Sequence, residues 1–531
     1  MIRGSDILKK LDFRKKKNWI SEFSSFDTSA FARLLETAPE SFWVRAGERR
    51  ALQIFHEAAK RVPAYKDFLK KHKINPAKIR TIKDFARVPT TDKRNYINAY
   101  SLKDRSWDGK VEGAKIAAVS SGTTGEPTFW PRGSYQEYEA AIIHELIYRY
   151  SFDIDRHRTL LVIGFPMGVY VSGIATFMPS MMVADKPQYN MTVVSAGNNK
   201  AEILRTVKNL QSEYDQIVLV GHPFFIKDVV ETGRREGIRW AKTKLRFMFC
   251  SEGFNEIWRK YVIKESGQDF GLRTAVSTYG SSELLLMAWE TPLSVYVRNF
   301  MQKSVDFKKK LTDTRWVPSI FQYNPLMRWI ESEEGSLVFT SASGLPLIRY
   351  NLHDGGAVVP FGKATEALDT SHKNWRGEFV REDARNFMWQ LPFVKLGGRT
   401  DQTMIFYAAN IYPEHIHLAL NHKPFLEKIT GKFVMHKHYL KNMDEYFEIN
   451  IELRVGVHPS KIFAKELENA VVQMLKRINL EYLDMSSKNT KKRTRPVIVL
   501  RTYQDEKYFK VGMKPKYIAA DSQAKASVLV K

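Results

Sequence analysis

Residues 118–128 restrict the possible fold more than any other stretch, because they gather hydroxyl groups and glycines between a strand pattern and a helix pattern. The apolar residues up to Val119 predict a strand and residues 135–150 predict a helix, so the stretch is a strand-to-helix loop. Glycines let several amide N–H groups point at one anion, and hydroxyl groups add donors. The residues concerned are Ser120, Ser121, Gly122, Thr123, Thr124 and Gly125. We predict a phosphate-binding loop here, with an ordinary serine- and glycine-rich turn as the alternative.

Length and cysteine content limit the class of protein. A chain of 531 residues exceeds one ordinary hydrophobic core, so we expect at least two domains. The single cysteine, Cys250, excludes an internal disulfide and a cysteine-based metal cluster. Charged residues interrupt every short apolar run near the first residue, which argues against a secretory signal there. We therefore expect a cytoplasmic protein.

The formal net charge of +25 indicates anionic partners without choosing among them. Nucleotides, the phosphates of CoA, nucleic acid and an anionic membrane surface would all be attracted. Two basic runs, residues 9–17 and 488–495, are interpreted as solvated surface. The second run has no interleaved aromatic residues on which bases could stack. We expect no nucleic-acid partner.

Residues 160–184 contain no charged side chain and are long enough to cross a bilayer. Pro166, Pro179 and several glycines interrupt them, and residues 160–163 have the pattern of a strand. A buried strand, a turn and a helix explain this pattern better than a membrane span does. We predict no transmembrane segment.

Strand-like and helix-like runs alternate through the middle of the chain. Residues 160–163, 216–220 and 245–250 predict buried strands, and residues 200–212 and 225–235 predict helices between them. This order predicts an α/β fold, with a sheet covered by helices. Ligands on such sheets gather beyond the carboxyl ends of the strands, and we expect the chemically interesting motifs to follow strands directly.

Several segments resemble one family in the same order along the chain. The loop at residues 118–128 lacks the Gly-Lys-Ser/Thr ending of a Walker A motif and resembles the phosphate loop of the adenylate-forming superfamily. Residues 62–68 and 82–93 resemble the N-terminal region of its phenylacetate–CoA ligases. Residues 278–283 match the superfamily's Tyr-Gly-x-Ser/Thr-Glu motif, and residues 345–354 resemble the family's Leu-Pro-Leu-Ile-Arg-Tyr-x-x-Gly-Asp pattern. The resemblance extends from about residue 51 to residue 518.

The resemblance implies a nucleotide site built from these motifs. It places Tyr279 against adenine, Glu283 on the Mg²⁺ that accompanies ATP, and Asp354 on both ribose hydroxyls. A carboxylate suits the ribose because it has only acceptor oxygens, and Mg²⁺ prefers carboxylate oxygens. His353 replaces the family's usual glycine, and we interpret it as a packing residue. Further nucleotide contacts are implied for Thr123, as a catalytic group, and for Ser251, Glu252, Gly280 and Ser282.

A second, smaller domain is implied after residue 400. Residues 398–402 resemble the family's hinge, with Arg399 reaching the ribose or phosphate and Asp401 as the pivot. Residues 447–453 and 497–501 predict strands and residues 459–477 predict a helix, which together indicate a small α+β domain. We predict a large N-terminal domain over 1–400, mainly helical in 1–110, and a small mobile one over 401–531. Two regions that resemble insertions, 295–328 and 361–391, contain no motif that we can interpret.

The closing pattern around residues 509–518 can be aligned with the family's catalytic lysine motif. The alignment implies that Lys514 is catalytic, with Met513 where glycine is usual, and leaves Lys510 and Lys516 as competitors. A positive charge there would stabilise the pentavalent phosphorus and the departing pyrophosphate.

The resemblance implies an AMP-forming acid–thiol ligase that uses ATP, Mg²⁺ and CoA. A carboxylic acid, aryl or otherwise apolar, would become acyl-AMP, and the small domain would then rotate to admit the CoA thiol. Six residues at or after strand ends could line the acid pocket and are equally plausible as core: Phe165, Met167, Tyr170, His222, Pro223 and Phe224.

Two alternatives stay open on the sequence. The enzyme could pass its activated group to an acceptor other than CoA, as coenzyme F390 synthetases and capsule-gene relatives are thought to do. A non-catalytic or nucleic-acid-binding protein on the ligase fold is the second, suggested by the charge of +25, His353 and the imperfect lysine motif. The sequence leaves the oligomeric state open.

Overall fold

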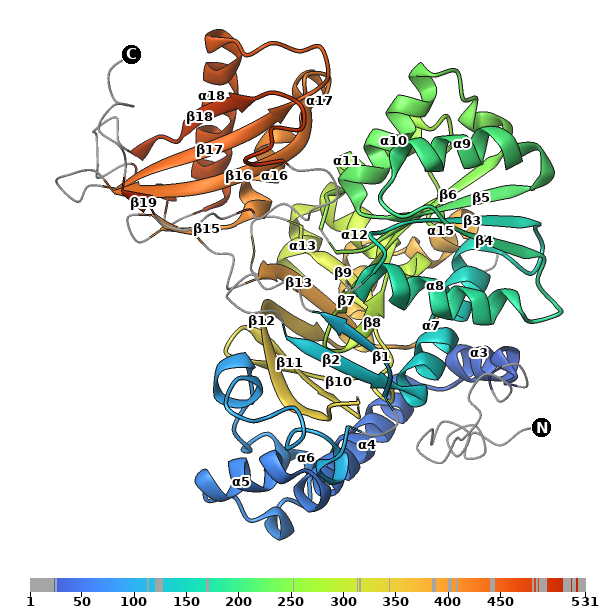
Figure 1. Ribbon diagram of the computed structural model, residues 1–531, viewed down its shortest axis with the longest axis vertical. Coiled ribbons are helices and arrows are strands. Elements are labelled where there is room, and N and C mark those ends of the chain that lie inside the picture. Colours follow the sequence, from blue (N-terminus) through green and yellow to red (C-terminus); the bar gives the residue numbers. More distant parts are fainter. Residues whose placement is uncertain are drawn as a thin grey trace. The chain divides into compact units, whose positions relative to one another are not determined.

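The structure, a computed structural model, divides into two compact units (Figure 1). The large unit comprises Met1–Glu252, Val262–Thr312 and Ser319–Leu396, and the small unit comprises Gly253–Tyr261, Asp313–Pro318 and Gly397–Lys531. The residues that the structure describes are 23, 26–111, 114–119, 128–168, 171–251, 253–312, 314, 317–342, 344–383, 388–399, 404–406, 409–439, 445–479, 482–483, 486, 494–509, 517 and 522–523.

Helices dominate the first part of the large unit. They are α3 (Thr28–Thr37), α4 (Glu40–Arg61), α5 (Pro63–Lys71) and α6 (Ile82–Phe85). Helix α4 ends where Pro63 begins the next helix, because proline favours the first helical position and disfavours a helical conformation in the residue before it. Buried Ile54 and Phe55 of α4 share a hydrophobic core with residues of β10 (Trp329–Glu333) and β11 (Ser336–Ser341), whereas Trp43 lies in a second core that includes residues of α3 and α7 (Ser134–Phe152).

A mixed sheet forms the centre of the large unit. Among the described residues it has eleven strands in the order β10-β11-β12-β13-β9-β8-β7-β6-β5-β3-β4. From β4 to β7 neighbouring strands are parallel, and β8 then pairs antiparallel with β7 and β9. The remaining strands are β3 (Thr159–Gly164), β4 (Met191–Ser195), β5 (Gln216–Gly221), β6 (Lys244–Phe249), β7 (Ala275–Ser281), β8 (Leu285–Trp289), β9 (Ser319–Gln322), β12 (Leu347–Val359) and β13 (Phe393–Arg399).

Helices cover both faces of the parallel strands, so the predicted α/β class is confirmed (Figure 1). Leu161 and Val218 face a core that includes residues of α7 and α8, whereas a Cβ added at Gly164 would lie 3.1 Å from Ile203 of α9 and 3.2 Å from Ile226 of α10. Because side chains alternate along a strand, the two helix pairs lie on opposite faces. The covering helices are α7 (Ser134–Phe152), α8 (Val171–Ala184), α9 (Lys200–Leu210) and α10 (Pro223–Arg235), with α11 (Glu256–Glu265) following β6.

The uncharged stretch at residues 160–184 is a strand, a connection and a helix, as predicted. Strand β3 is buried along its whole length, and α8 contains Pro179. Among the described residues, the structure contains no helix with both the length and the apolar character needed to cross a membrane.

The two regions that resemble insertions also contain regular structure. Strand β9 in the first region pairs with β13, and α14 and α13 contact one another. Their helices are α12 (Pro292–Lys303), α13 (Val305–Leu311), α14 (Phe361–Ser371) and α15 (Trp375–Glu382). The second region and most of the first therefore belong to the large unit, whereas Asp313–Pro318 of the first region belong to the small unit.

The small unit is an antiparallel and parallel sheet packed on helices. Its sheet has the order β18-β17-β16-β19, and Phe433, Met435, Phe447 and Ile449 alternate toward a core that it shares with α16 and α18. Ser460 caps α18 by accepting a hydrogen bond from Phe463 N. The elements are β14 (Met404–Phe406), β15 (Ala409–Ile411), α16 (Pro413–Leu420), α17 (Lys423–Leu426), β16 (Ile429–Tyr439), β17 (Glu445–Leu453), α18 (Lys461–Ile478), β18 (Val497–Arg501) and β19 (Ser522–Gln523). The predicted α+β arrangement of this region is confirmed.

Each unit contains a buried histidine that makes its stability sensitive to acid. Burial lowers the pKa of His144 in α7 to about 4, and it lowers the pKa of His415 in α16 to about 4. In the unfolded chain both return to about 6.5. Between these values the unfolded state binds more protons, so stability falls as the pH drops through this window.

We therefore expect the free energy of unfolding of the large unit to fall by about 2 kcal/mol through His144 between pH 7 and pH 5. Urea unfolding at the two pH values, on wild type and His144→Gln, measures this difference. Glutamine carries no titrating group and can still donate to the Ala140 carbonyl that lies 2.8 Å from His144 Nδ1. An identical pH dependence in the variant would contradict the assignment.

Candidate active site

Tyr279 and Asp354, which both belong to motifs of the predicted nucleotide site, meet in the large unit. Tyr279 lies in β7 and its hydroxyl donates a short hydrogen bond to Oδ2 of Asp354 in β12. Four strand spacings separate β7 from β12 in the sheet order, which would be roughly 19 Å in a flat sheet. The sheet must therefore curl so that these two strands face one another. Both side chains are largely buried, at 7% and 5% exposure.

Aromatic packing fixes the ring of Tyr279. It stacks on Phe321 with ring centroids 5.9 Å apart and planes at 24°, and lies 6.1 Å from Phe339 at 60°. Offset and tilted contacts of this kind are favourable for aromatic pairs. The hydroxyl is therefore held toward Asp354, which carries the acceptor oxygens predicted for a ribose.

We predicted that the Tyr-Gly-x-Ser/Thr-Glu motif would follow a strand directly. The motif instead begins inside β7. Tyr279 and Gly280 belong to β7 because antiparallel pairing with β8 extends the strand to Ser281. The register shifts between these two residues, and a Cβ added at Gly280 would lie 2.8 Å from the carbonyl oxygen of Leu285. Glycine is thus required by a close backbone approach across the hairpin.

Glu283 and Ser282 lie in the turn beyond β7, and Ser251 lies just beyond β6. Glu283 is half-buried, and among the described residues its carboxylate has no hydrogen-bond or ion-pair partner. A hard carboxylate that is not already paired suits the Mg²⁺ implied by the motif. Ser251 has a φ of 77°, so the chain turns sharply directly after its parallel strand.

His353 keeps the backbone conformation that explains the family's preference for glycine at this position. Its φ is 60°, in the left-handed region, where a non-glycine residue costs roughly 1 kcal/mol. Its amide donates to Asn351 Oδ1 over 2.7 Å, and its Nε2 lies 3.2 Å from Oδ2 of Asp92. These contacts tie the backbone beside Asp354 to Asn351 and Asp92.

The sequence reasoning missed two residues that hold this strand. Thr91 lies beside β12 and makes three hydrogen bonds to it. Its amide donates to the Arg349 carbonyl (3.0 Å) and its carbonyl accepts from the Asn351 amide (2.8 Å). Its hydroxyl donates to the Ile348 carbonyl (2.9 Å). The Arg349 side chain is buried and pairs with Glu331 and Glu333. Both residues lie inside segments quoted for the family resemblance, which was the available signal, but their partners are far away in sequence.

Other predicted residues cannot be placed. The phosphate loop from Ser120 to Gly125, with Thr123, lies outside the described residues, as do Glu252, Asp401 and Lys514. Arg399 is the last residue of β13, and only its backbone is described. The roles of these residues stay predictions.

The six candidates for the acid pocket separate into core and partly accessible residues. Phe165 is buried in the core, whereas Met167 and His222 are only partly buried and Pro223 begins α10. Tyr170 and the Phe224 side chain lie outside the described residues.

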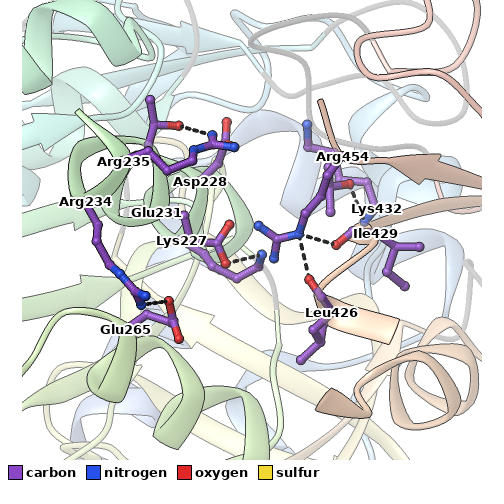
Figure 2. Close-up of polar contacts among 12 residues, drawn as sticks. Lys227, Asp228, Glu231, Arg234, Arg235, Glu265, Leu426, Ile429, Lys432 and Arg454 are labelled. Carbon is purple, nitrogen blue, oxygen red and sulfur yellow. Dashed lines mark hydrogen bonds and ion pairs between the residues drawn. The ribbon is translucent and has the colours of Figure 1, made fainter. Parts of the chain in front are cut away.

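Ion pairs hold α10, the helix that follows His222. Figure 2 shows Lys227 paired with Glu231 along the helix at 3.0 Å, and Arg234 paired with Glu265 of α11 at 2.6 Å. In the small unit, the same figure shows that Arg454 Nε donates to the carbonyls of Leu426 (2.6 Å) and Ile429 (3.1 Å), which fixes the end of β17.

No family model matches the chain, but two curated proteins and several solved structures do. The chain is 23% identical over 442 residues to the phenylacetate–coenzyme A ligase of Aromatoleum evansii, covering 80% of this chain and 87% of that protein. It is 22% identical over 394 residues to the enzyme of the same name from Thermus thermophilus, covering 73% and 77%.

A 2-hydroxyisobutyryl-CoA ligase in the postadenylation state shares the fold. The TM-score is 0.63 at 15% identity, over 93% of this chain and 92% of that one. The structure of the same ligase with 2-hydroxyisobutyryl-AMP and CoA in the thioesterification state gives a TM-score of 0.52 at 16% identity. The motifs therefore occur in the expected order, Tyr279 lies against Asp354, and the chain is similar in sequence to phenylacetate–coenzyme A ligases and in fold to the 2-hydroxyisobutyryl-CoA ligase.

Proposed function

We propose that the protein is an AMP-forming acid–CoA ligase that activates an aryl or other apolar carboxylic acid. The observation that carries the proposal is the hydrogen bond between Tyr279 and Asp354, which joins two nucleotide motifs on strands 75 residues apart in the chain. The relatives named phenylacetate–coenzyme A ligase, which align with most of the chain, support the reaction class.

The first half-reaction joins the acid to AMP. An oxygen of the substrate carboxylate attacks the α-phosphorus of ATP, and the bond to the β-phosphate oxygen breaks to release pyrophosphate. Asp354 accepts hydrogen bonds from the ribose hydroxyls, and Tyr279 orients that carboxylate. Glu283 provides the carboxylate for Mg²⁺, which neutralises phosphate charge when bound. The phosphate loop and Lys514 complete the charge stabilisation in this proposal.

The second half-reaction transfers the acyl group to CoA. The CoA sulfur attacks the acyl carbonyl, the thiol proton is lost, and AMP departs as a far better leaving group than oxide. No protein nucleophile is needed, because the acyl adenylate is already activated. In this scheme the small domain rotates about Asp401. The rotation removes Lys514 from the phosphate site and opens the path by which CoA enters.

Pyrophosphate release from Mg-ATP tests the proposal. A panel of aryl, fatty and hydroxy acids is assayed with and without CoA, and thioester formation is followed separately. We expect pyrophosphate to be released only with a suitable aryl or apolar acid. CoA should stimulate this release, and the amount of thioester formed should equal the amount of pyrophosphate released. Acid-dependent release without a CoA requirement would indicate another acceptor, and no release with any acid would overturn the ligase assignment.

Asp354→Asn tests the nucleotide site itself. We expect the KM for ATP to rise about 10- to 100-fold, because a charged acceptor of ribose hydroxyls contributes about 1.5–3 kcal/mol. Tyr279→Phe, which removes only the hydroxyl that orients Asp354, should give a smaller rise. Steady-state kinetics over ATP concentration, with urea unfolding as a control for stability, measure both effects. A loss of stability with an unchanged KM would assign Asp354 a structural role instead.

A further inference from the structure

Two histidines and a glutamate gather on the sheet of the small unit, away from its hydrophobic core. His436 and His438 are two residues apart in β16, so they stand on the same face. The alternate residues Phe433 and Met435 face the core with α16 and α18. Glu448 in β17 lies directly opposite His436 in the antiparallel pair. Strand register alone therefore brings three potential metal ligands together.

The ligand atoms are close enough to share one ion. One nitrogen of each histidine and a carboxylate oxygen of Glu448 all lie within 4.8 Å of one another. His438 Nε2 is 3.7 Å from Glu448 Oε2. A tetrahedral zinc site with bonds of about 2.0–2.2 Å has ligand atoms about 3.3–3.5 Å apart, so small side-chain rotations suffice.

Neighbouring side chains orient these ligands. Tyr446 donates a hydrogen bond to Glu448 Oε2 over 3.2 Å, and its ring stacks on His438 at 4.7 Å and 15°. Asn450 donates to the other oxygen, Oε1, over 2.7 Å. Outer partners of this kind fix ligand orientation in known metal sites. His436 Nε2 is buried and makes no hydrogen bond among the described residues.

We propose that His436, His438 and Glu448 form a binding site for a divalent transition metal ion of the zinc class. Two imidazoles and one carboxylate suit Zn²⁺ rather than Mg²⁺ or Ca²⁺, which prefer all-oxygen ligands. Three protein ligands leave a fourth position for water. The site is independent of the proposed ligase chemistry, and its role is to tie β16 to β17.

The positive charges of Lys507 and Arg501 disfavour a bound metal ion at this site and make an anion the alternative ligand. Burial lowers the pKa of the His436 imidazole, Glu448 raises it, and His438, Lys507 and Arg501 lower it further. The neutral imidazole is the form that binds metals. The same two cations would instead favour a phosphate ion on protonated histidines, so inorganic phosphate is the competitor to be measured.

Binding of Zn²⁺ to the full-length protein, without an affinity tag and after treatment with a chelator, tests the proposal. We expect one tight equivalent by competition with a chromophoric chelator, and a rise in the thermal midpoint with Zn²⁺ because the ion binds the folded state. His436→Gln and Glu448→Gln should each weaken binding at least tenfold, and Tyr446→Phe about tenfold. His458→Gln, at an exposed position of the same unit, should change nothing.

Urea unfolding of the metal-free variants and of the metal-free wild type shows whether a substitution damages folding. If a ligand variant folds poorly, the Zn²⁺ affinity of Tyr446→Phe is used to test the site instead. Equal Zn²⁺ affinity in wild type, His436→Gln and Glu448→Gln would overturn the proposal. So would several weak equivalents that His458→Gln reduces, or saturable phosphate binding in place of Zn²⁺.

Discussion

Lys514→Ala is expected to reduce acid-dependent pyrophosphate release about 10²- to 10³-fold, the usual effect of removing one preorganised group that stabilises transition-state charge. The substitution removes a positive charge from the position implied for the pentavalent phosphorus, where charge develops only during the reaction. We therefore expect kcat to fall much more than the KM for ATP changes. Single-turnover formation of acyl-AMP, measured in wild type and variant, isolates this step.

Lys510→Ala and Lys516→Ala are the matched controls, because they remove the same charge from neighbouring positions. We expect both to retain release within a few-fold of wild type. Thioester formation from preformed acyl-AMP and CoA should survive in Lys514→Ala, since the lysine is assigned to the first half-reaction alone. A large loss in one control and none in Lys514→Ala would move the catalytic role to that lysine.

Lys186→Met is expected to destabilise the large unit by about 3–5 kcal/mol, as when one partner of a buried ion pair is removed. Lys186 Nζ lies 2.6 Å from Oε2 of Glu145, and both side chains are fully buried. The ammonium also donates to the Phe26 carbonyl, and Glu145 accepts from Thr28 and Tyr189. The substitution leaves a buried carboxylate that lacks its cation.

Urea unfolding followed by tryptophan fluorescence measures this loss. Adding Glu145→Gln to Lys186→Met should restore part of the stability, because the uncompensated charge is removed with its partner. Lys208→Met breaks a pair of similar length, 2.8 Å to Glu236, that is nearly half exposed, and we expect a change of at most about 1 kcal/mol. Equal losses of unfolding free energy in Lys186→Met and Lys208→Met would contradict the prediction that the buried ion pair contributes more than the exposed one.

Local patterns were sufficient to predict several elements of both units and the order of the motifs. The apolar runs at 160–163, 216–220 and 245–250 became β3, β5 and β6, because each is a short buried run bounded by breaks. The glycines and prolines of residues 160–184 favoured a buried strand, a turn and a helix over a membrane span, for the same local reason. The family resemblance added Tyr279, Glu283 and Asp354 as a set, without showing how they lie.

Contacts between distant parts of the chain could not be predicted from local patterns and were known only from the tertiary structure. The extension of β7 through Tyr279 and Gly280 depends on pairing with β8, which no local pattern encodes. The hydrogen bond between Tyr279 and Asp354 depends on the curvature of the whole sheet. The attachment of Thr91 to β12 joins residues 257 positions apart.

The sequence by itself determined the element types, the α/β class and the residue types available for nucleotide chemistry, because propensity, periodicity and glycine positions act within a few residues. The tertiary structure decided which of those residues meet. It alone placed Asp354 on Tyr279, gave His353 its left-handed backbone beside Asp92, and set His436 opposite Glu448. Such encounters depend on strand order, register and curvature, which are set by the packing of the complete core.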